Sequence, residues 1–248
     1  MEYNKQLFED FISRLRDEYL ESRKTRLFFG ADKDLVHRGR SASISSTTEN
    51  LVACLIAKEL EYHGKKDFVI FVDIPISIEG YRFPKYPDIV VCLRDGSRTR
   101  EIVKGRKEKT VEKQELEHYK ICYMCDVKTD AGWIRGKGAE ICDEHALIVS
   151  GICNNGIKKG SVNKKDISME CAEGTCYDVV VVSECNGSIE GEANPQTPYS
   201  KWYILTQGSH TNEYDAQKYL DNPPKPYSRT ADIGYEAFLS RVIATIPD

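Results

Sequence analysis

Several features that would place this sequence in a membrane or secreted class are missing from it. No apolar run approaches the roughly 20 residues needed to cross a bilayer. The opening MEYNKQLFEDF lacks the basic-then-apolar layout of a secretory signal peptide, and neither internal repeats nor low-complexity segments occur. The 248 residues, 40% of them hydrophobic, are instead typical of a globular chain that can bury its own core. We therefore expect a cytoplasmic protein with one domain, residues 1–248.

The cysteines give little support for disulfide bonds. There are nine, an odd number, and they are scattered along a chain without a signal peptide. We therefore expect reduced thiols, most of them small core residues. Cys122 and Cys125 form a CxxC, but a strand would point them to opposite faces, which argues against a shared metal or a disulfide. A structural zinc site stays open as an alternative, with Cys142, His145, Cys171 and Cys176 as its ligands.

Charge is unevenly distributed along the chain, whose net charge is -4. Residues 94–113 carry eight Lys or Arg against four acids, whereas residues 166–192 contain acids but neither Lys nor Arg. The negative net charge argues against a protein that coats nucleic acid indiscriminately. A net charge nevertheless says nothing of where positive and negative residues gather. Two interpretations of residues 94–113 remain: a basic face, or a solvated loop and helix.

Hydrophobic periodicity predicts helices alternating with strands. The predicted helices cover residues 3–24, packed on the main body, Thr47 or Thr48 to about 63, 138–153 and 235–246. The predicted strands cover residues 68–78, 88–93, 121–127, 177–183 and 201–206. The runs 88–93 and 121–127 are apolar on both faces, as in central strands covered by helices. We predict an α/β fold with a central mixed sheet of about five strands flanked by helices.

Two acids and a lysine stand at the ends of two apolar strands. Asp88 stands at the head of the apolar run 88–93, and Asp126-Val127-Lys128 closes the next apolar strand. Alternation places Asp126 and Lys128 on one face, and antiparallel pairing of the strands would bring Asp88 beside them. Two carboxylates with a backbone carbonyl, that of Val127, suit Mg²⁺ or Mn²⁺. Such a site can activate water and stabilise charge on a phosphate, which is the chemistry of phosphodiester hydrolysis.

These residues resemble the motif of the PD-(D/E)XK nuclease superfamily, written here as Pro87-Asp88, 37 intervening residues, then Asp126-Val127-Lys128. The resemblance implies a restriction-endonuclease-like fold and Mg²⁺-dependent cleavage of DNA, with Mn²⁺ able to substitute. The chain looks most like a type II restriction endonuclease. The gap between the two halves of the motif is long for a simple hairpin, so we expect residues 95–118, which include a helical stretch, to be an insertion.

Two further acids have competing interpretations. Glu49 lies in the helix before the sheet, which in the restriction-type branch of this family often supplies a carboxylate to the metal site. Ser46 and Glu49 also fit a capping box, in which Glu49 bonds back to the Ser46 amide, so both roles stay open. Asp73 sits within the run 68–78, where a structural ion pair is favoured over catalysis.

The expected partner is double-stranded DNA, bound by a homodimer that cuts both strands of a two-fold symmetric site. The candidate DNA contacts are loop residues whose side chains suit base edges or phosphates, and of these Arg135 and Lys137 should lie nearest the scissile group. They are Arg135, Lys137, Asn154, Asn155, Gln207, Ser209, His210 and Asn212. Two alternatives remain: a structure-specific or repair nuclease such as a junction resolvase, and a non-catalytic interaction protein in which Asp88, Asp126 and Lys128 are a buried ion-pair network.

Overall fold

The structure is a computed structural model that describes residues 3–28, 45–104, 110–130, 138–183, 197–206 and 233–247. Its helices are α1 (Lys5–Phe28), α2 (Ser45–Tyr62), α3 (Gly138–Asn155) and α5 (Ile233–Thr245). Its strands are β1 (Phe68–Val72), β2 (Ile76–Ile78), β3 (Ile89–Lys104), β4 (Thr110–Asp130), β5 (Ile157–Val162), β6 (Lys165–Ser183) and β7 (Trp202–Thr206). No helix in these ranges is both long and apolar enough to cross a membrane.

The strands join in one mixed sheet. Its order is β1-β3-β4-β6-β5-β2, and β7 pairs with β6 on a branch. β1, β3 and β4 form an antiparallel meander, whereas β6 runs parallel to both β4 and β7. Parallel strands need a crossover connection between them. Here α3 and β5 carry the chain from the end of β4 back to the start of β6. The predicted α/β fold with a mixed sheet is confirmed, and the described part of the sheet has seven strands rather than about five.

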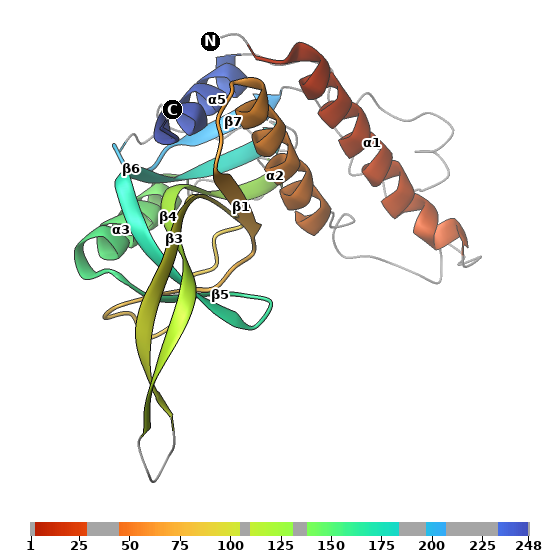
Figure 1. Cartoon of the computed structure of the whole chain (residues 1–248). Helices are drawn as coiled ribbons and strands as arrows, with labels where there is room; N and C mark the ends of the chain where they lie inside the picture. The colour runs from red at the N-terminus through yellow and green to blue at the C-terminus, as the bar shows by residue number, and fades with distance from the viewer. Residues whose placement is uncertain are drawn as a thin grey trace.

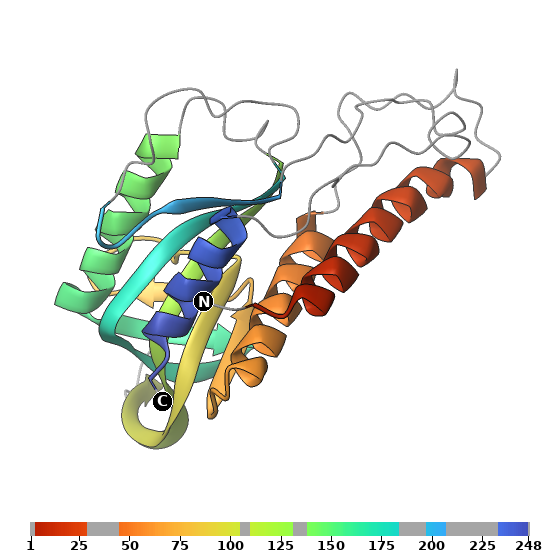
Figure 2. The ribbon, with the colours of Figure 1, turned by 90° about the horizontal axis from the view of Figure 1, so that it is seen from above.

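Helices cover both faces of the sheet (Figure 1, Figure 2). Tyr123 and Val127 of β4 pack into a core with apolar residues of α1, α2 and α5. Met124, on the other face of the same strand, packs into a second core with α3 and β2. β4 is therefore buried on both sides, which explains why residues 121–127 are apolar without the alternation of a half-exposed strand.

The prediction that residues 95–118 form an insertion with a helical stretch is wrong. β3 and β4 form one long antiparallel hairpin that continues in register to Lys104 and Thr110 and extends well beyond the body of the sheet (Figure 1). Most residues of this extension are polar, and its few apolar residues do not alternate with them, so no period-2 pattern marks it as strand. Glu101 and Lys113 stand directly opposite each other across the ribbon, and opposite charges in such positions stabilise a strand pair.

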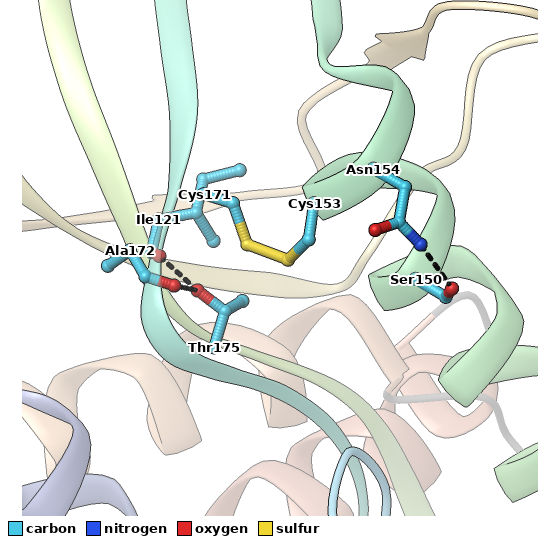
Figure 3. Close-up of a disulfide and its surroundings, with 7 residues drawn as sticks. All are labelled: Ile121, Ser150, Cys153, Asn154, Cys171, Ala172 and Thr175. Carbon is cyan, nitrogen blue, oxygen red and sulfur yellow. Dashed lines mark hydrogen bonds between the residues drawn. A yellow bond between two sulfur atoms is a disulfide. The ribbon is translucent and has the colours of Figure 1, made fainter.

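The expectation that all cysteines are reduced is also wrong for two of them. Cys153, near the end of α3, forms a disulfide with Cys171 of β6 (Figure 3). The two residues are 18 positions apart, and their Cα atoms are brought to 5.4 Å by the packing of the helix against the sheet. Tertiary packing, not spacing, made this pair possible. Because this disulfide is present, the cysteines no longer support the expectation of a reducing compartment.

The CxxC cysteines do not point to opposite faces as expected. The register of β4 against β3 shifts next to Cys122, so that Val91 pairs with Tyr123 and Cys92 with Ile121. This bulge breaks the alternation, and Cys122 and Cys125 both contribute to the core beneath α1, α2 and α5. Both are free thiols, as expected.

Candidate active site

The antiparallel pairing of β3 and β4 brings the predicted Asp88, Asp126 and Lys128 together. Ile89 pairs with Cys125, so the residue before β3 faces the end of β4. The Val127 amide donates a hydrogen bond to Asp88 Oδ2 at 2.7 Å. The Lys128 ammonium lies 3.8 Å from Asp88 Oδ2 and also 3.8 Å from Asp126 Oδ2. The predicted juxtaposition of these three side chains is therefore present.

Asp126 is held by two aromatic neighbours that come from other elements. The Tyr177 hydroxyl of β6 donates to Asp126 Oδ1 at 2.6 Å, and His145 Nε2 of α3 lies 3.3 Å from Asp126 Oδ2. The imidazole stacks on the phenol ring. Burial alone would raise the pKa of the Asp126 carboxyl, but His145, Lys128 and Tyr177 hold that pKa below its ordinary value. Asp126 is thus kept ionised.

The other two carboxyls are shifted the opposite way. Burial, followed by repulsion from Asp126, raises the pKa of Asp88, and the attraction of Lys128 does not cancel this effect. Burial, then repulsion from Asp88 and Asp73, raises the pKa of Glu49 on α2. Neighbouring acids whose pKa values are pushed apart are typical of sites that move protons or bind cations.

The carboxylates of these acids are the oxygen ligands that a hard cation prefers, but they are too far apart to bind one ion together. Burial first, and then repulsion among the acids around Lys128, raises the pKa values of Glu49 and Asp88. A divalent cation with oxygen ligands, as Mg²⁺ prefers, would relieve that repulsion. The ligand atoms of Glu49, Asp88 and Asp126 are nevertheless not all within 4.8 Å of one another. Shared binding of one ion therefore requires them to move closer together.

Glu49 and Asp73 both lie beside this site. α2 begins at Ser45, so Ser46 falls within the helix, and Glu49 is half-buried next to Asp88. Whether its carboxylate serves the site or the helix terminus stays a prediction. Asp73 is not inside a strand but just after β1, with a positive φ of 51°. Its amide donates to the Asp88 carbonyl at 2.9 Å, which ties the two loops together.

Sequence reasoning missed the roles of His145 and Tyr177. The sequence offers His145 as a ligand of a possible zinc site with three cysteines, but the structure separates that set. Cys142 packs with Val179 and Val181, Cys176 lies on the opposite face of β6, and Cys171 is in the disulfide. Tyr177 and Asp126 meet through the parallel β4–β6 pairing across 51 positions of sequence. No local pattern signals such a contact.

Two of the predicted DNA contacts can be placed. Asn154 and Asn155 are exposed at the end of α3, and Asn154 Nδ2 donates to Ser150 Oγ at 2.9 Å. They follow His145 by about nine residues, roughly 14 Å along the helix, so they are not gathered around Asp126. The other predicted contacts lie outside the described residues: Arg135, Lys137, Gln207, Ser209, His210 and Asn212.

Comparisons with known proteins add no family to this description: no protein-family model matches the sequence, and no curated protein matches it significantly.

Proposed function

We propose that the protein is a Mg²⁺-dependent endonuclease of the PD-(D/E)XK kind, most like a type II restriction endonuclease, with Mn²⁺ able to replace Mg²⁺. The observation that carries the proposal is the meeting of Asp88, Asp126 and Lys128 where β3 and β4 pair, with one ammonium 3.8 Å from both carboxylates. The order of the elements supports it, because a helix, an antiparallel meander, a helix and a parallel strand frame these residues.

The residues have distinct roles in this proposal. Asp88 and Asp126, with the Val127 carbonyl and Glu49, hold the cation, which when bound lowers the pKa of a water and stabilises charge on the phosphate. Asp126 is prepared for this role because His145 and Tyr177 keep it ionised and oriented. Lys128 is close enough to the carboxylates to orient the attacking water or to neutralise the phosphate.

The proposed substrate is double-stranded DNA, cut in the cytoplasm by a homodimer whose two-fold axis matches that of the recognition site. A repair nuclease acting on branched DNA is the alternative within the same chemistry. It would use the same carboxylates, so only the choice of substrate separates the two.

One observation favours a second, non-catalytic function. Lys128 lies at the same distance from Asp88 and Asp126, as it would in an ion-pair network that merely joins β3 to β4. Against it, the pKa of Asp88 remains raised beside that lysine, so the ammonium alone does not compensate the acids. A purely structural pair would be expected to favour both charged forms.

Plasmid cleavage tests the proposal. We expect the full chain to cut supercoiled or linear double-stranded DNA with Mg²⁺ but not with EDTA, and Asp126→Asn and Lys128→Met to lower the rate by at least about a hundred-fold. Asp10→Asn and Lys66→Met, which change exposed residues to the same types, are the matched controls and should cut like wild type. Circular dichroism checks that each variant folds.

The products decide among the alternatives. Discrete fragments from a library of plasmids indicate a sequence-specific enzyme, and cleavage confined to synthetic junctions indicates a resolvase. If folded wild-type protein cuts none of these DNAs with Mg²⁺ or Mn²⁺, or if Asp126→Asn cuts at the wild-type rate, the nuclease proposal fails. The ion-pair function would then remain.

A further inference from the structure

A second cluster of charged side chains lies at the base of the β3–β4 hairpin. Asp95 of β3, His118 of β4 and Glu170 of β6 place their ligand atoms within 4.8 Å of one another. His118 precedes Asp126 by eight residues of the same strand, or roughly 26 Å at about 3.3 Å per residue. The cluster is therefore separate from the candidate active site and joins three neighbouring strands of the sheet.

Asp95 reaches the cluster because β3 bulges at this point. Asp95 and Gly96 of β3 stand together opposite the single residue His118 of β4. Gly96 has a φ of 76°, in the left-handed region that glycine adopts without strain. A bulge re-aims the side chain beside it, and here it brings the Asp95 carboxylate toward the imidazole. In β6, strand alternation places Ser168 and Glu170 on the same face.

His118 is buried with one nitrogen unsatisfied. Its side chain is 1% exposed, and Nε2 has no hydrogen-bond partner among the residues that the structure describes. Nδ1 lies 2.9 Å from Ser168 Oγ, which fixes the ring so that Nε2 faces the two carboxylates. A buried polar nitrogen without a partner costs free energy unless something outside the described residues binds it.

The distances around Nε2 suit a metal ion better than a hydrogen bond. Nε2 is 3.7 Å from Asp95 Oδ2 and 3.5 Å from Glu170 Oε1. Both separations exceed hydrogen-bond length. Two ligands bound at about 2.0–2.1 Å to a tetrahedral ion lie roughly 3.4 Å apart, close to these values. An imidazole in the donor set favours a transition metal over Mg²⁺ or Ca²⁺.

We propose that Asp95, His118 and Glu170 form a zinc site that clamps β3, β4 and β6 together at the base of the hairpin. Ser168 acts as the outer-shell partner that holds the His118 ring in its metal-binding orientation. The three ligands come from paired strands and lie far from the candidate catalytic carboxylates, and water completes the tetrahedral coordination of the proposed ion.

Two cations compete for these carboxylates, and that competition makes the proposal testable. Lys120 Nζ lies 3.2 Å from Asp95 Oδ2, and Arg98 lies 2.9 Å from Glu170 Oε2. They balance the acids when no ion is bound. The Lys120 side chain is 40% exposed, so its ammonium can turn into solvent when Zn²⁺ takes its place. Removal of Lys120 should therefore strengthen zinc binding, whereas a purely ionic cluster would only be weakened.

Titration of the EDTA-treated full chain with Zn²⁺ in a calorimeter is the decisive measurement. We expect wild type to bind Zn²⁺ at this cluster and Lys120→Met to bind it more tightly. Glu170→Gln or Asp95→Asn should lose more than the roughly 10- to 100-fold that removing an outer-shell partner costs. Zn²⁺ should also raise the melting temperature of wild type but not of Glu170→Gln. Asp10→Asn, which alters an exposed acid of α1, serves as the control and should bind Zn²⁺ like wild type.

Co²⁺ in place of Zn²⁺ identifies the ligands, because cysteine ligation produces thiolate charge-transfer absorption and nitrogen and oxygen ligands do not. We expect only the weaker ligand-field bands. Three results would each overturn the proposal: no Zn²⁺ binding by folded wild type and Lys120→Met, unchanged binding in folded Glu170→Gln, or thiolate bands in the Co²⁺ form.

Discussion

His145 of α3 lies flat against Tyr177 of β6, with ring centroids 3.7 Å apart and ring planes 2° from parallel. The stack lets two residues from different elements approach the two oxygens of the same Asp126 carboxylate. α3 therefore does more than cover the sheet, because it also positions a group that holds the candidate catalytic acid.

Loss of either partner of Asp126 should shift the pH dependence of cleavage. In Tyr177→Phe the hydroxyl that stabilises the ionised carboxylate is gone, so the pKa of Asp126 rises and the acidic limb of the rate profile moves to higher pH. We expect the rate at neutral pH to fall by about ten-fold or more, as for a hydrogen bond to a charged group. His145→Phe keeps the stack and removes the nitrogen, so it should shift the profile in the same direction. An unshifted profile in both variants would contradict this role.

Neutralising Asp88 and neutralising Asp126 should change the stability of the protein in opposite directions. The raised pKa of Asp88 means that its charge costs folding free energy above its ordinary pKa, so Asp88→Asn should raise the melting temperature at pH 7 by about 1–4 °C. That gain should vanish in acid, where the wild-type carboxyl is protonated.

The lowered pKa of Asp126 means that its charge contributes stability above its ordinary pKa. This stability is lost as the pH falls through the pKa of Asp126 in the folded protein. Asp126→Asn should therefore lower the melting temperature at pH 7, with Asp10→Asn as the neutral control.

Arg241 should contribute to stability through the buried Asp178. Asp178 is fully buried and accepts hydrogen bonds from Arg241 Nε at 3.3 Å and from the Lys201 amide at 2.8 Å. In Arg241→Met the carboxylate loses its counter-ion in the core, and we expect a loss of about 3 kcal/mol in unfolding free energy at pH 7. Burial raises the pKa of Asp178, so the loss should shrink as pH falls and the acid protonates. Denaturant unfolding measures it, and the double variant with Asp178→Asn should recover part of the loss.

The disulfide between Cys153 and Cys171 should make stability depend on redox conditions. Closing a loop of 18 residues restricts the unfolded chain and contributes about 3 kcal/mol, so a reducing agent should lower the melting temperature by roughly 6–12 °C. Cys153→Ser should melt like reduced wild type and be insensitive to the reductant. Cys54→Ser, which alters an exposed free thiol, should behave as wild type in both conditions. Equal melting of oxidised and reduced wild type would exclude the bond.

Local patterns predicted most of the elements that frame the candidate site. The helical spacing of apolar residues placed α2, α3 and α5 within about two residues of their observed bounds, because helix periodicity is a property of a short segment. The same reasoning failed on the outer half of β3 and β4, where the sequence has no apolar alternation to mark a strand. It failed again at Cys122, because a bulge in β4 turns this side chain to the same face of the sheet as Cys125.

The sequence by itself determined which apolar segments become strands and which charged residues stand at their ends, and so it sufficed to select Asp88, Asp126 and Lys128. Only the tertiary structure decided what surrounds them. The parallel register of β4 with β6 and the docking of α3 place Tyr177 and His145 on Asp126, and the same docking pairs Cys153 with Cys171. Such contacts join segments far apart in the chain, and their geometry follows from the packing of the whole sheet and its helices rather than from any local preference.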